Sequence, residues 1–214
     1  MSKVASDVSL TRRIARRVLG RDALDNRRRV LEMMPSQSVC AEIGVWKGDF
    51  SARILEVVRP AILHLIDPWR FEAGPEYSEA WYGGSAAKSQ ADMDAIHAAV
   101  RSRFEPQVES GRVAVRRQAS AAAAEAFEDG YFDWVYIDAN HQYEFVMQDL
   151  QAYWPKVKTG GMVAGDDYGT PGWWEDGVTL AVREFSAQVP ATLQTLGTQF
   201  ILTKRSRERE GSES

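Results

Sequence analysis

From residue 38 onward, short apolar runs that indicate strands alternate with segments whose apolar residues recur at helical spacing. Such alternation predicts a parallel sheet with helices on both faces. The last two apolar runs, 192–197 and 198–204, leave no room for a crossover helix, so we expect them to pair antiparallel. The other predicted strands are 38–43, 61–67, 112–117, 131–138 and 160–166, and the predicted helices are 48–58, 88–104, 120–127, 142–154 and 176–187.

The N-terminal part has a different pattern. Residues 8–34 predict one or two helices that end before Pro35. Their arginines suggest either an anionic partner or, as is usual for soluble helices, a solvated face; the segment could also cap an active site or form a dimer contact. We therefore expect an N-terminal helical extension over 1–35, one α/β domain over 36–204 and a disordered, charged tail over 205–214. The arginines are Arg12, Arg13, Arg16, Arg17, Arg21, Arg27, Arg28 and Arg29.

Length and composition narrow the class of protein. A chain of 214 residues suits one core of ordinary domain size. Its formal net charge of −4 argues against a nucleic-acid partner, which needs an excess of Lys and Arg. No apolar stretch approaches the length of a membrane span, and the N-terminus lacks the apolar core of a signal peptide. The single cysteine, Cys40, lies in an apolar run and suits a buried thiol in a reducing cytoplasm. We expect a cytoplasmic protein.

The segment 68–87 interrupts the alternation after the second predicted strand. It contains five aromatic residues and no clear period. A long loop within a compact domain usually serves as a lid or a binding loop, and this one starts at the sheet edge where ligands bind. We expect a lid, although aromatic loop residues can also simply pack on the surface. The aromatics are Trp69, Phe71, Tyr77, Trp81 and Tyr82.

A glycine turn follows the first predicted strand. Ligands of open parallel sheets bind outside the carboxyl ends of the strands. Here Glu42 precedes Gly44, and Gly48 follows four residues later. Glycine lets the backbone approach a ligand closely, although the motif could also be a plain tight turn. Because it is not the G-x-G-x-x-G of dinucleotide sites, the turn suits a ligand without a pyrophosphate.

Asp67 ends the second predicted strand, 23 residues beyond Gly44. An acid at this place can accept hydrogen bonds from both hydroxyls of an adenosine ribose. Asp67 could instead cap the backbone before Pro68. The glycine turn upstream favours the ribose role.

Three acids end the fourth and fifth predicted strands: Asp138, then Asp166 and Asp167. Converging carboxylates repel one another unless a cation lies between them or their pKa values rise. Hard cations such as Mg²⁺ prefer oxygen ligands of this kind. We expect a divalent metal site at Asp138, Asp166 and Asp167. Asp138 could otherwise serve as a helix cap, but capping does not explain the acidic pair on the neighbouring strand.

His141 lies three residues after Asp138, where the next predicted helix begins. A helix N-terminus disfavours the imidazolium, so we expect a largely neutral His141 that can accept a proton. It could also be a metal ligand or a structural residue. The other histidines, His64 and His97, are expected in packing or on solvated faces.

These motifs together resemble class I S-adenosylmethionine (SAM)-dependent methyltransferases over roughly residues 36–204. The resemblance rests on E-x-G-x-x-x-G, a strand-end acid, FDWVYIDANHxY, DLxxYWPKVKxGG and GDDY. Within this class the chain is most similar to metal-dependent O-methyltransferases related to the catechol, macrocin and cephalosporin-pathway enzymes. The interval of 28 residues between Asp138 and Asp166 is the most specific feature, because the catechol enzymes space their metal acids in the same way.

The resemblance implies a Rossmann-like, doubly wound α/β sheet of seven strands in order 3-2-1-4-5-7-6, with the last strand antiparallel. It implies adenine contacts near Gln118, Ala119 and Ser120. The other expected SAM-binding residues are Glu42, Gly44, Gly48, Asp67 and Asp138. Two departures stand out. Relatives commonly have an acid where this chain has Ala119, and the catechol enzymes have a lysine base and an asparagine ligand where this chain has His141 and Asp167. The second departure favours the sugar-methylating branch.

The expected activity is metal-assisted O-methylation of a small molecule, a sugar or a natural product, with SAM and Mg²⁺ or another divalent cation as cofactors. His141 would act as the base and Asp138 would join it in catalysis. A homo-oligomer is possible, without nucleic-acid or membrane partners. Two other hypotheses are a nicotinamide-dependent oxidoreductase, because Asp67 suits either cofactor, and a SAM-binding scaffold without transferase activity.

Overall fold

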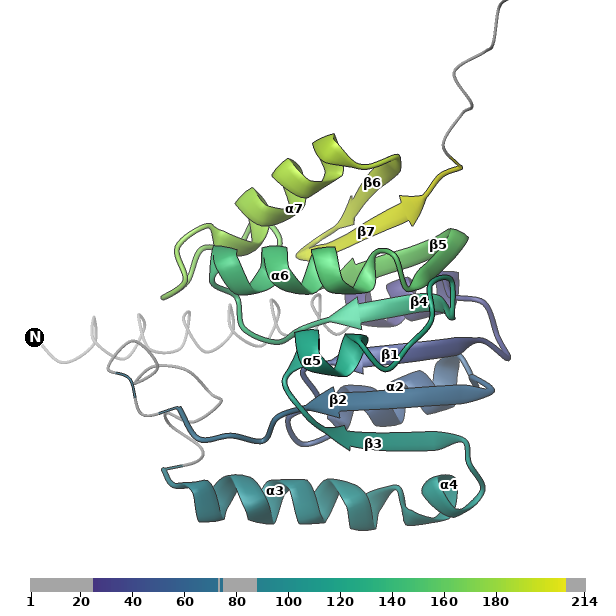
Figure 1. The fold of residues 1–214 in the computed structure, drawn as a ribbon, viewed down its shortest axis with the longest axis vertical. Coiled ribbons are helices and arrows are strands. Elements are labelled where there is room, and N and C mark those ends of the chain that lie inside the picture. Colours follow the sequence, from purple (N-terminus) through teal and green to yellow (C-terminus); the bar gives the residue numbers. More distant parts are fainter. Residues whose placement is uncertain (1–24, 73, 75–87, 207–214) are drawn as a thin grey trace, which may run out of the picture.

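The structure is a computed structural model, and it describes residues 25–72, 74 and 88–206. Its centre is a seven-stranded sheet in the order β3-β2-β1-β4-β5-β7-β6 (Figure 1). The β1–β2, β2–β3, β1–β4 and β4–β5 pairs are parallel, whereas β7 pairs antiparallel with both β5 and β6. The predicted fold class and strand order are therefore confirmed. The strands are β1 Val39–Ile43, β2 Ile62–Asp67, β3 Val113–Arg117, β4 Phe132–Ile137, β5 Val157–Gly165, β6 Ala191–Leu196 and β7 Gln199–Lys204.

Helices cover both faces of this sheet. In Figure 1, α5 and α6 lie in front of the strands and α2 lies behind them. Residues 25–33 form a further helix, which confirms the described part of the N-terminal prediction; residues 1–24 and 207–214 lie outside the described residues. No helix in the described part of the chain has the length and apolar character that a membrane crossing needs. The helices are α2 Asp49–Val57, α3 Gln90–Arg103, α4 Glu105–Glu109, α5 Ser120–Ala124, α6 Tyr143–Tyr153 and α7 Gly177–Gln188.

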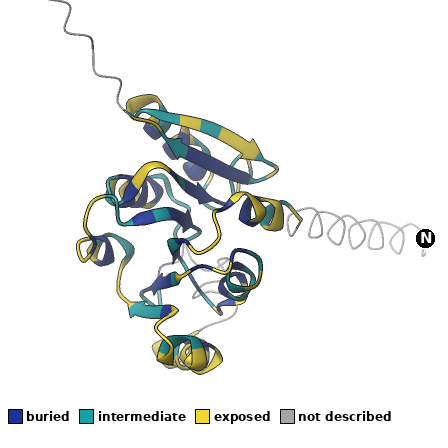
Figure 2. Ribbon diagram, turned by 90° about the vertical axis from the view of Figure 1, so that its right-hand side faces the viewer, coloured by how far each residue is buried: buried dark blue, intermediate teal, exposed yellow. Residues whose placement is uncertain are grey.

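Alternating side chains of the central strands build two cores. On β4, Val135 and Ile137 face the core formed with α5, α6 and α7, whereas Trp134 and Tyr136 face the core formed with α2, α3 and residues 25–33. The central strands β1, β2 and β4 are largely buried, whereas the edge strand β6 is partly exposed and the outer faces of the helices are exposed (Figure 2). Neighbouring residues of a strand point to opposite faces of the sheet, so a strand that is buried on both faces is apolar throughout. This is why the central strands are visible in the sequence as continuous apolar runs.

The predicted and observed elements differ most clearly at β5 and at α4. β5 begins at Val157 rather than 160, and the register between β4 and β5 shifts by a bulge next to Phe132 and Trp134. The predicted strand began at the glycines 160 and 161, whereas in the structure they lie within β5, where Gly160 has a φ of 83° and belongs to the irregular part of the strand. The short helix α4 was not predicted; five residues are too few to show a helical period.

Candidate active site

The glycine turn after β1 brings the backbone against the next strand end. Gly44 has a φ of 88°, and a β-carbon added there would lie 2.1 Å from the carbonyl oxygen of Asp138. Gly48, with a φ of 76°, caps the N-terminus of α2, and a β-carbon there would meet the ring of Phe104. Both positions therefore require glycine on conformational and steric grounds. The glycine turn therefore places the carboxyl end of β1 next to Asp138, at the edge of the sheet where the candidate site lies.

Glu42, the last residue but one of β1, is only 2% exposed. Its carboxyl accepts a hydrogen bond from the hydroxyl of Ser51 on α2. Burial raises the pKa of Glu42 to about 8, because the Ser51 hydrogen bond offsets only part of the cost of desolvating the charge. A buried carboxyl of this kind is suited to receive a cationic group.

Asp67 ends β2 and lies almost entirely below the surface. Its Oδ2 accepts hydrogen bonds from the backbone N–H groups of Val45 (2.9 Å) and Trp46 (3.0 Å), and its Oδ1 accepts one from Trp69 (2.6 Å). Asp67 thus ties the glycine turn to the end of β2.

The predicted adenine residues lie between β3 and α5. Gln118 and Ala119 are exposed, and Ala119 caps α5 without a side-chain hydrogen bond. Ser120 donates a hydrogen bond from its hydroxyl to Asp149 on α6. Asp149 is 2% exposed, and its burial raises its pKa to about 7 despite this bond. Sequence inspection did not single out Asp149, because an acid within an amphipathic helix is ordinarily on the solvated face.

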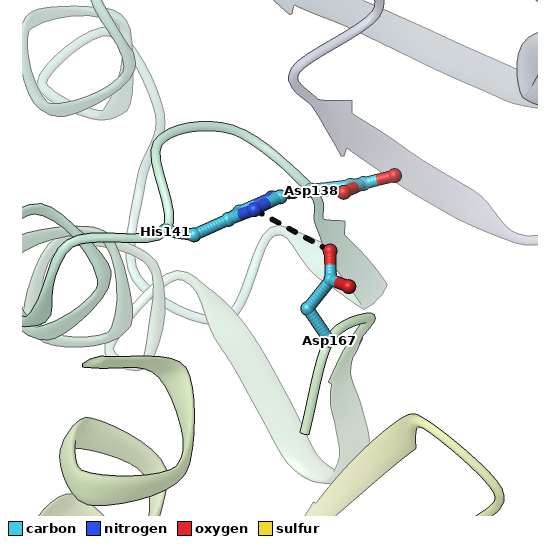
Figure 3. A group of neighbouring side chains, drawn as sticks. All are labelled: Asp138, His141 and Asp167. Atoms are coloured by element: carbon cyan, nitrogen blue, oxygen red, sulfur yellow. Dashed lines mark hydrogen bonds and ion pairs between the residues drawn. The ribbon is translucent and has the colours of Figure 1, made fainter. Parts of the chain in front are cut away.

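Asp138, His141 and Asp167 converge at the ends of β4 and β5 (Figure 3). Within the described part of the chain, these three residues offer ligand atoms that all lie within 4.8 Å of one another. His141 Nε2 is 3.3 Å from Asp138 Oδ1, and His141 Nδ1 is 3.4 Å from Asp167 Oδ2. Asp167 adopts a φ of 61°, in the left-handed region. Two carboxylates and an imidazole form a donor set that a divalent cation can accept.

Asp166 contacts Arg27 and the residues at the start of β7 rather than His141. Its Oδ1 accepts hydrogen bonds from the Thr198 hydroxyl (2.6 Å), from Gln199 Nε2 and from the backbone N–H of Asp167 (2.8 Å). Its Oδ2 accepts one from Arg27 Nε at 2.7 Å. The three predicted acids are therefore not equivalent. Asp138 and Asp167 lie together with His141, whereas Asp166 is linked to Asp138 through Arg27.

Arg27, in the helix of residues 25–33, bridges two of these acids. Its Nη2 lies 2.8 Å from Asp138 Oδ2 and also contacts Asp166 Oδ2. The prediction of a solvated face for the basic helix is thus wrong for Arg27, although it holds for Arg28, whose side chain is 63% exposed. One signal could have revealed it: Arg27 precedes buried Val30 and Leu31 by three and four residues, which places it on their face of the helix.

Electrostatics at His141 differ from the prediction. Burial disfavours the imidazolium, but the hydrogen bond and charge of Asp138, with the charges of Asp167 and Asp166, outweigh burial and raise the pKa of His141 above its usual value. The helix whose dipole was expected to keep His141 neutral begins two residues later, at Tyr143. Burial raises the pKa of Asp167 to about 6, whereas Arg27 and His141 lower the pKa of Asp138 although burial opposes them.

Aromatic residues flank this group. The ring of Trp174 packs edge-on against His141, with centroids 4.6 Å apart. In the segment predicted as a lid, Trp69 is fully buried in the core and donates from Nε1 to the carbonyl oxygen of Trp46, so it is not a lid residue. Phe71 is partly buried against the same core. Tyr77, Trp81 and Tyr82 lie outside the described residues.

His64 and His97 serve packing, as expected. His64 lies among the rings of Phe127, Tyr131 and Phe132, and burial lowers its pKa to about 4. His97 stacks on Trp69 with centroids 4.7 Å apart. Cys40 is buried, and burial raises the pKa of its thiol.

The fold and the strand-end site define a class I SAM-dependent methyltransferase. Residues 41–168 match the family described as a methyltransferase domain, and the chain belongs to this family. No curated protein matches the chain significantly.

Three solved structures illustrate the likeness of fold. The O-methyltransferase NovP is 22% identical, with 87% of this chain and 80% of NovP covered and a TM-score of 0.58. A candidate rRNA methylase from Clostridium thermocellum is 13% identical, with 86% and 97% covered and a TM-score of 0.59. The MycE methyltransferase from the mycinamycin biosynthetic pathway, in complex with Mg and SAH, is 16% identical, with 82% of this chain but 47% of MycE covered and a TM-score of 0.51.

Proposed function

We propose that this protein transfers the methyl group of SAM to a hydroxyl of a small molecule, with the help of a divalent metal ion. The observation that carries the proposal is the convergence of Asp138, His141 and Asp167 next to the glycine turn. Carboxylates and an imidazole at this place suit the activation of a hydroxyl group, which must lose its proton as it is methylated.

The strand ends supply the groups that would hold SAM. Glu42 offers a buried carboxyl to the cationic amino group of the methionine moiety, and the backbone at Gly44 and Gly48 allows close approach. Asp67, at the carboxyl end of β2, would accept hydrogen bonds from the ribose hydroxyls. The adenine would lie near Gln118, Ala119 and Ser120. When bound, SAM supplies a methyl group activated by the sulfonium charge.

Asp138, Asp166 and Asp167 would hold the metal ion, with His141 close enough to join them. A bound divalent ion supplies Lewis acidity, which lowers the pKa of an acceptor hydroxyl. The acids fit such an ion because three carboxylates lie in this region, and the single guanidinium of Arg27, which pairs with Asp138 and Asp166, carries a smaller positive charge than a divalent ion. The MycE methyltransferase, which has a similar fold, is described in complex with Mg, and this agrees with the proposed use of a metal ion.

His141 would remove the proton from the acceptor. Its ring nitrogens lie beside the carboxylates of Asp138 and Asp167, which orient the imidazole and would stabilise an imidazolium formed during the reaction. One of these two contacts would give way to the acceptor hydroxyl, whose proton passes to that ring nitrogen. Trp174 packs against the ring and would limit access of water. Holding the acceptor oxygen about 3 Å from the methyl group would contribute several kcal/mol to catalysis.

A sugar or natural-product hydroxyl is the favoured acceptor. His141 and Asp167 are the residues that distinguish this chain from the catechol enzymes, and NovP and MycE are described as an O-methyltransferase and as a methyltransferase of a biosynthetic pathway. The net charge of −4 disfavours nucleic acid as the acceptor, in contrast to the rRNA-methylase description of one structural neighbour.

Transfer of labelled methyl from SAM to a panel of sugars, polyols and natural products that carry hydroxyl groups tests this function. We expect transfer with Mg²⁺, loss of transfer in excess EDTA and recovery when Mg²⁺ is restored, with an unchanged dissociation constant for SAM. Full activity in EDTA would contradict the metal. Tight SAM binding without transfer to any acceptor would favour the scaffold hypothesis, and binding of NAD instead of SAM would favour an oxidoreductase.

A further inference from the structure

Arg27 is the part of the acid site that the proposed mechanism does not use. Its guanidinium donates through Nε to Asp166 Oδ2 at 2.7 Å and through Nη2 to Asp138 Oδ2 at 2.8 Å. The guanidinium carbon also lies 5.3 Å from the ring centroid of Phe50 on α2. Contacts with two carboxylates and an aromatic face fix the planar group between β4, β5 and α2.

These contacts occupy the oxygens through which the acids would bind a metal ion. Asp166 has both oxygens engaged, one by Arg27 and the other by Thr198 and Gln199. Asp138 is divided, because its Oδ2 faces Arg27 while its Oδ1 faces His141. Asp138 therefore lies between the guanidinium of Arg27 on one side and, on the other, the position beside His141 where a metal ion would bind.

We propose that Arg27 is a positioning residue that competes with the divalent metal ion. Its guanidinium neutralises Asp138 and Asp166 when no metal ion is bound. The proposal rests on the proposed function insofar as that function includes a metal. In the absence of the ion, the guanidinium holds Asp138 and Asp166 together. When the ion binds, Arg27 must release Asp166, and the helix of residues 25–33 is thereby coupled to occupation of the site.

Electrostatics explains the competition. A divalent ion on Asp138 and Asp167 would lie beside a guanidinium that shares the Asp138 carboxylate, and two cations at this separation repel strongly in a partly buried site. Asp166 cannot contribute Oδ2 to the ion while Nε and Nη2 of Arg27 occupy it. Release is feasible because Arg27 is attached by a long flexible side chain to a surface helix whose next residue, Arg28, is largely exposed.

The direct test measures the affinity for Mn²⁺ by electron paramagnetic resonance in the full chain without SAM. We compare the unaltered protein with Arg27→Gln and with the control Arg28→Gln. The control removes a charge from the same helix, but Arg28 pairs with Glu32 rather than with Asp138 or Asp166. Arg27→Gln should bind Mn²⁺ roughly tenfold more tightly, because the competing charge is gone, and Arg28→Gln should bind as the unaltered protein does. Equal or weaker Mn²⁺ binding by Arg27→Gln would overturn the competition.

A second measurement uses the unaltered protein, in case Arg27→Gln folds poorly. The side-chain Nε–H resonance of Arg27 should shift and lose its protection from solvent exchange as Mg²⁺ is added, in proportion to metal binding, while that of Arg28 stays constant. An unchanged Arg27 signal while Mg²⁺ binds would overturn the inference and leave the metal-assisted function standing. If no variant binds either ion, the metal part of the proposed function falls, and this inference falls with it.

Discussion

Gly44 faces the carbonyl oxygen of Asp138 so closely that a β-carbon on Gly44 would lie 2.1 Å from that oxygen. The end of β1, which would bind the cofactor, thus presses against the first residue after β4, which would bind the metal. The two parts of the site share one backbone contact. A change at Gly44 therefore acts on both.

Gly44→Ala should lower the free energy of unfolding by about 3 kcal/mol, because it combines a left-handed φ with a clash against backbone. It should also weaken SAM binding at least tenfold. Chemical denaturation and calorimetric titration with SAM measure the two effects. Gly130→Ala is the matched control: its φ is 70° but nothing lies within 4 Å of the added β-carbon, so we expect a loss of about 1 kcal/mol and unchanged SAM binding. Normal stability of Gly44→Ala would contradict the geometry.

Glu42 should make the protein less stable as the pH rises. Burial raises its folded-state pKa from 4.5 to about 8, so between these values the unfolded chain releases a proton that the folded chain retains. The stability present below pH 4.5 is lost as the pH rises towards 8, by on the order of a few kcal/mol. Urea unfolding of the SAM-free protein at pH 5, 6.5 and 8 measures this loss.

Glu42→Gln should flatten that pH dependence because it cannot ionise. Glu56→Gln, on the exposed face of the same helix that contacts Glu42, provides the comparison and should behave as the unaltered protein does. Identical pH profiles for Glu42→Gln and the unaltered protein would mean that Glu42 is already ionised in the folded state.

Asp149 should give a separate, narrower pH effect. Its pKa rises from 3.8 to about 7 through burial, so its contribution to stability is complete below pH 3.8 and is lost as the pH approaches 7. Asp149→Asn keeps a group that can bond to Ser120 but carries no charge. We expect this variant to be more stable than the unaltered protein at pH 8, and to show its smallest advantage at pH 4.5. Thermal unfolding at the two pH values tests the expectation, and a variant that is less stable at pH 8 would refute it.

His141→Ala should reduce turnover by about 10²- to 10⁴-fold, the usual effect of removing a general base. The affinity for SAM should change little, because the proposed cofactor contacts lie at the ends of β1, β2 and β3. Single-turnover kinetics and equilibrium SAM binding separate the two quantities. Asp67→Asn provides the contrast and should weaken SAM binding more than it slows the bound complex. An unaltered rate in His141→Ala would remove it as the base.

The sequence by itself determined the layers and the strand-end residues of this protein. Apolar runs such as 131–138 and 61–67 are buried on both faces of the sheet, so their character is visible without any neighbour. The positions of Glu42, Asp67 and Asp138 follow from the same pattern, because parallel strands end at one edge. The antiparallel hairpin was also readable, since two residues between β6 and β7 exclude a crossover.

Tertiary structure alone decided how the acids are distributed. Asp166 and Asp167 are adjacent in sequence, yet Asp166 bonds to Thr198, Gln199 and Arg27 while the left-handed backbone of Asp167 brings its side chain to His141. Arg27 meets Asp138 across 111 residues and Asp166 across 139. Local periodicity places a residue on a face of its own element, but which distant charge it meets depends on how the elements pack.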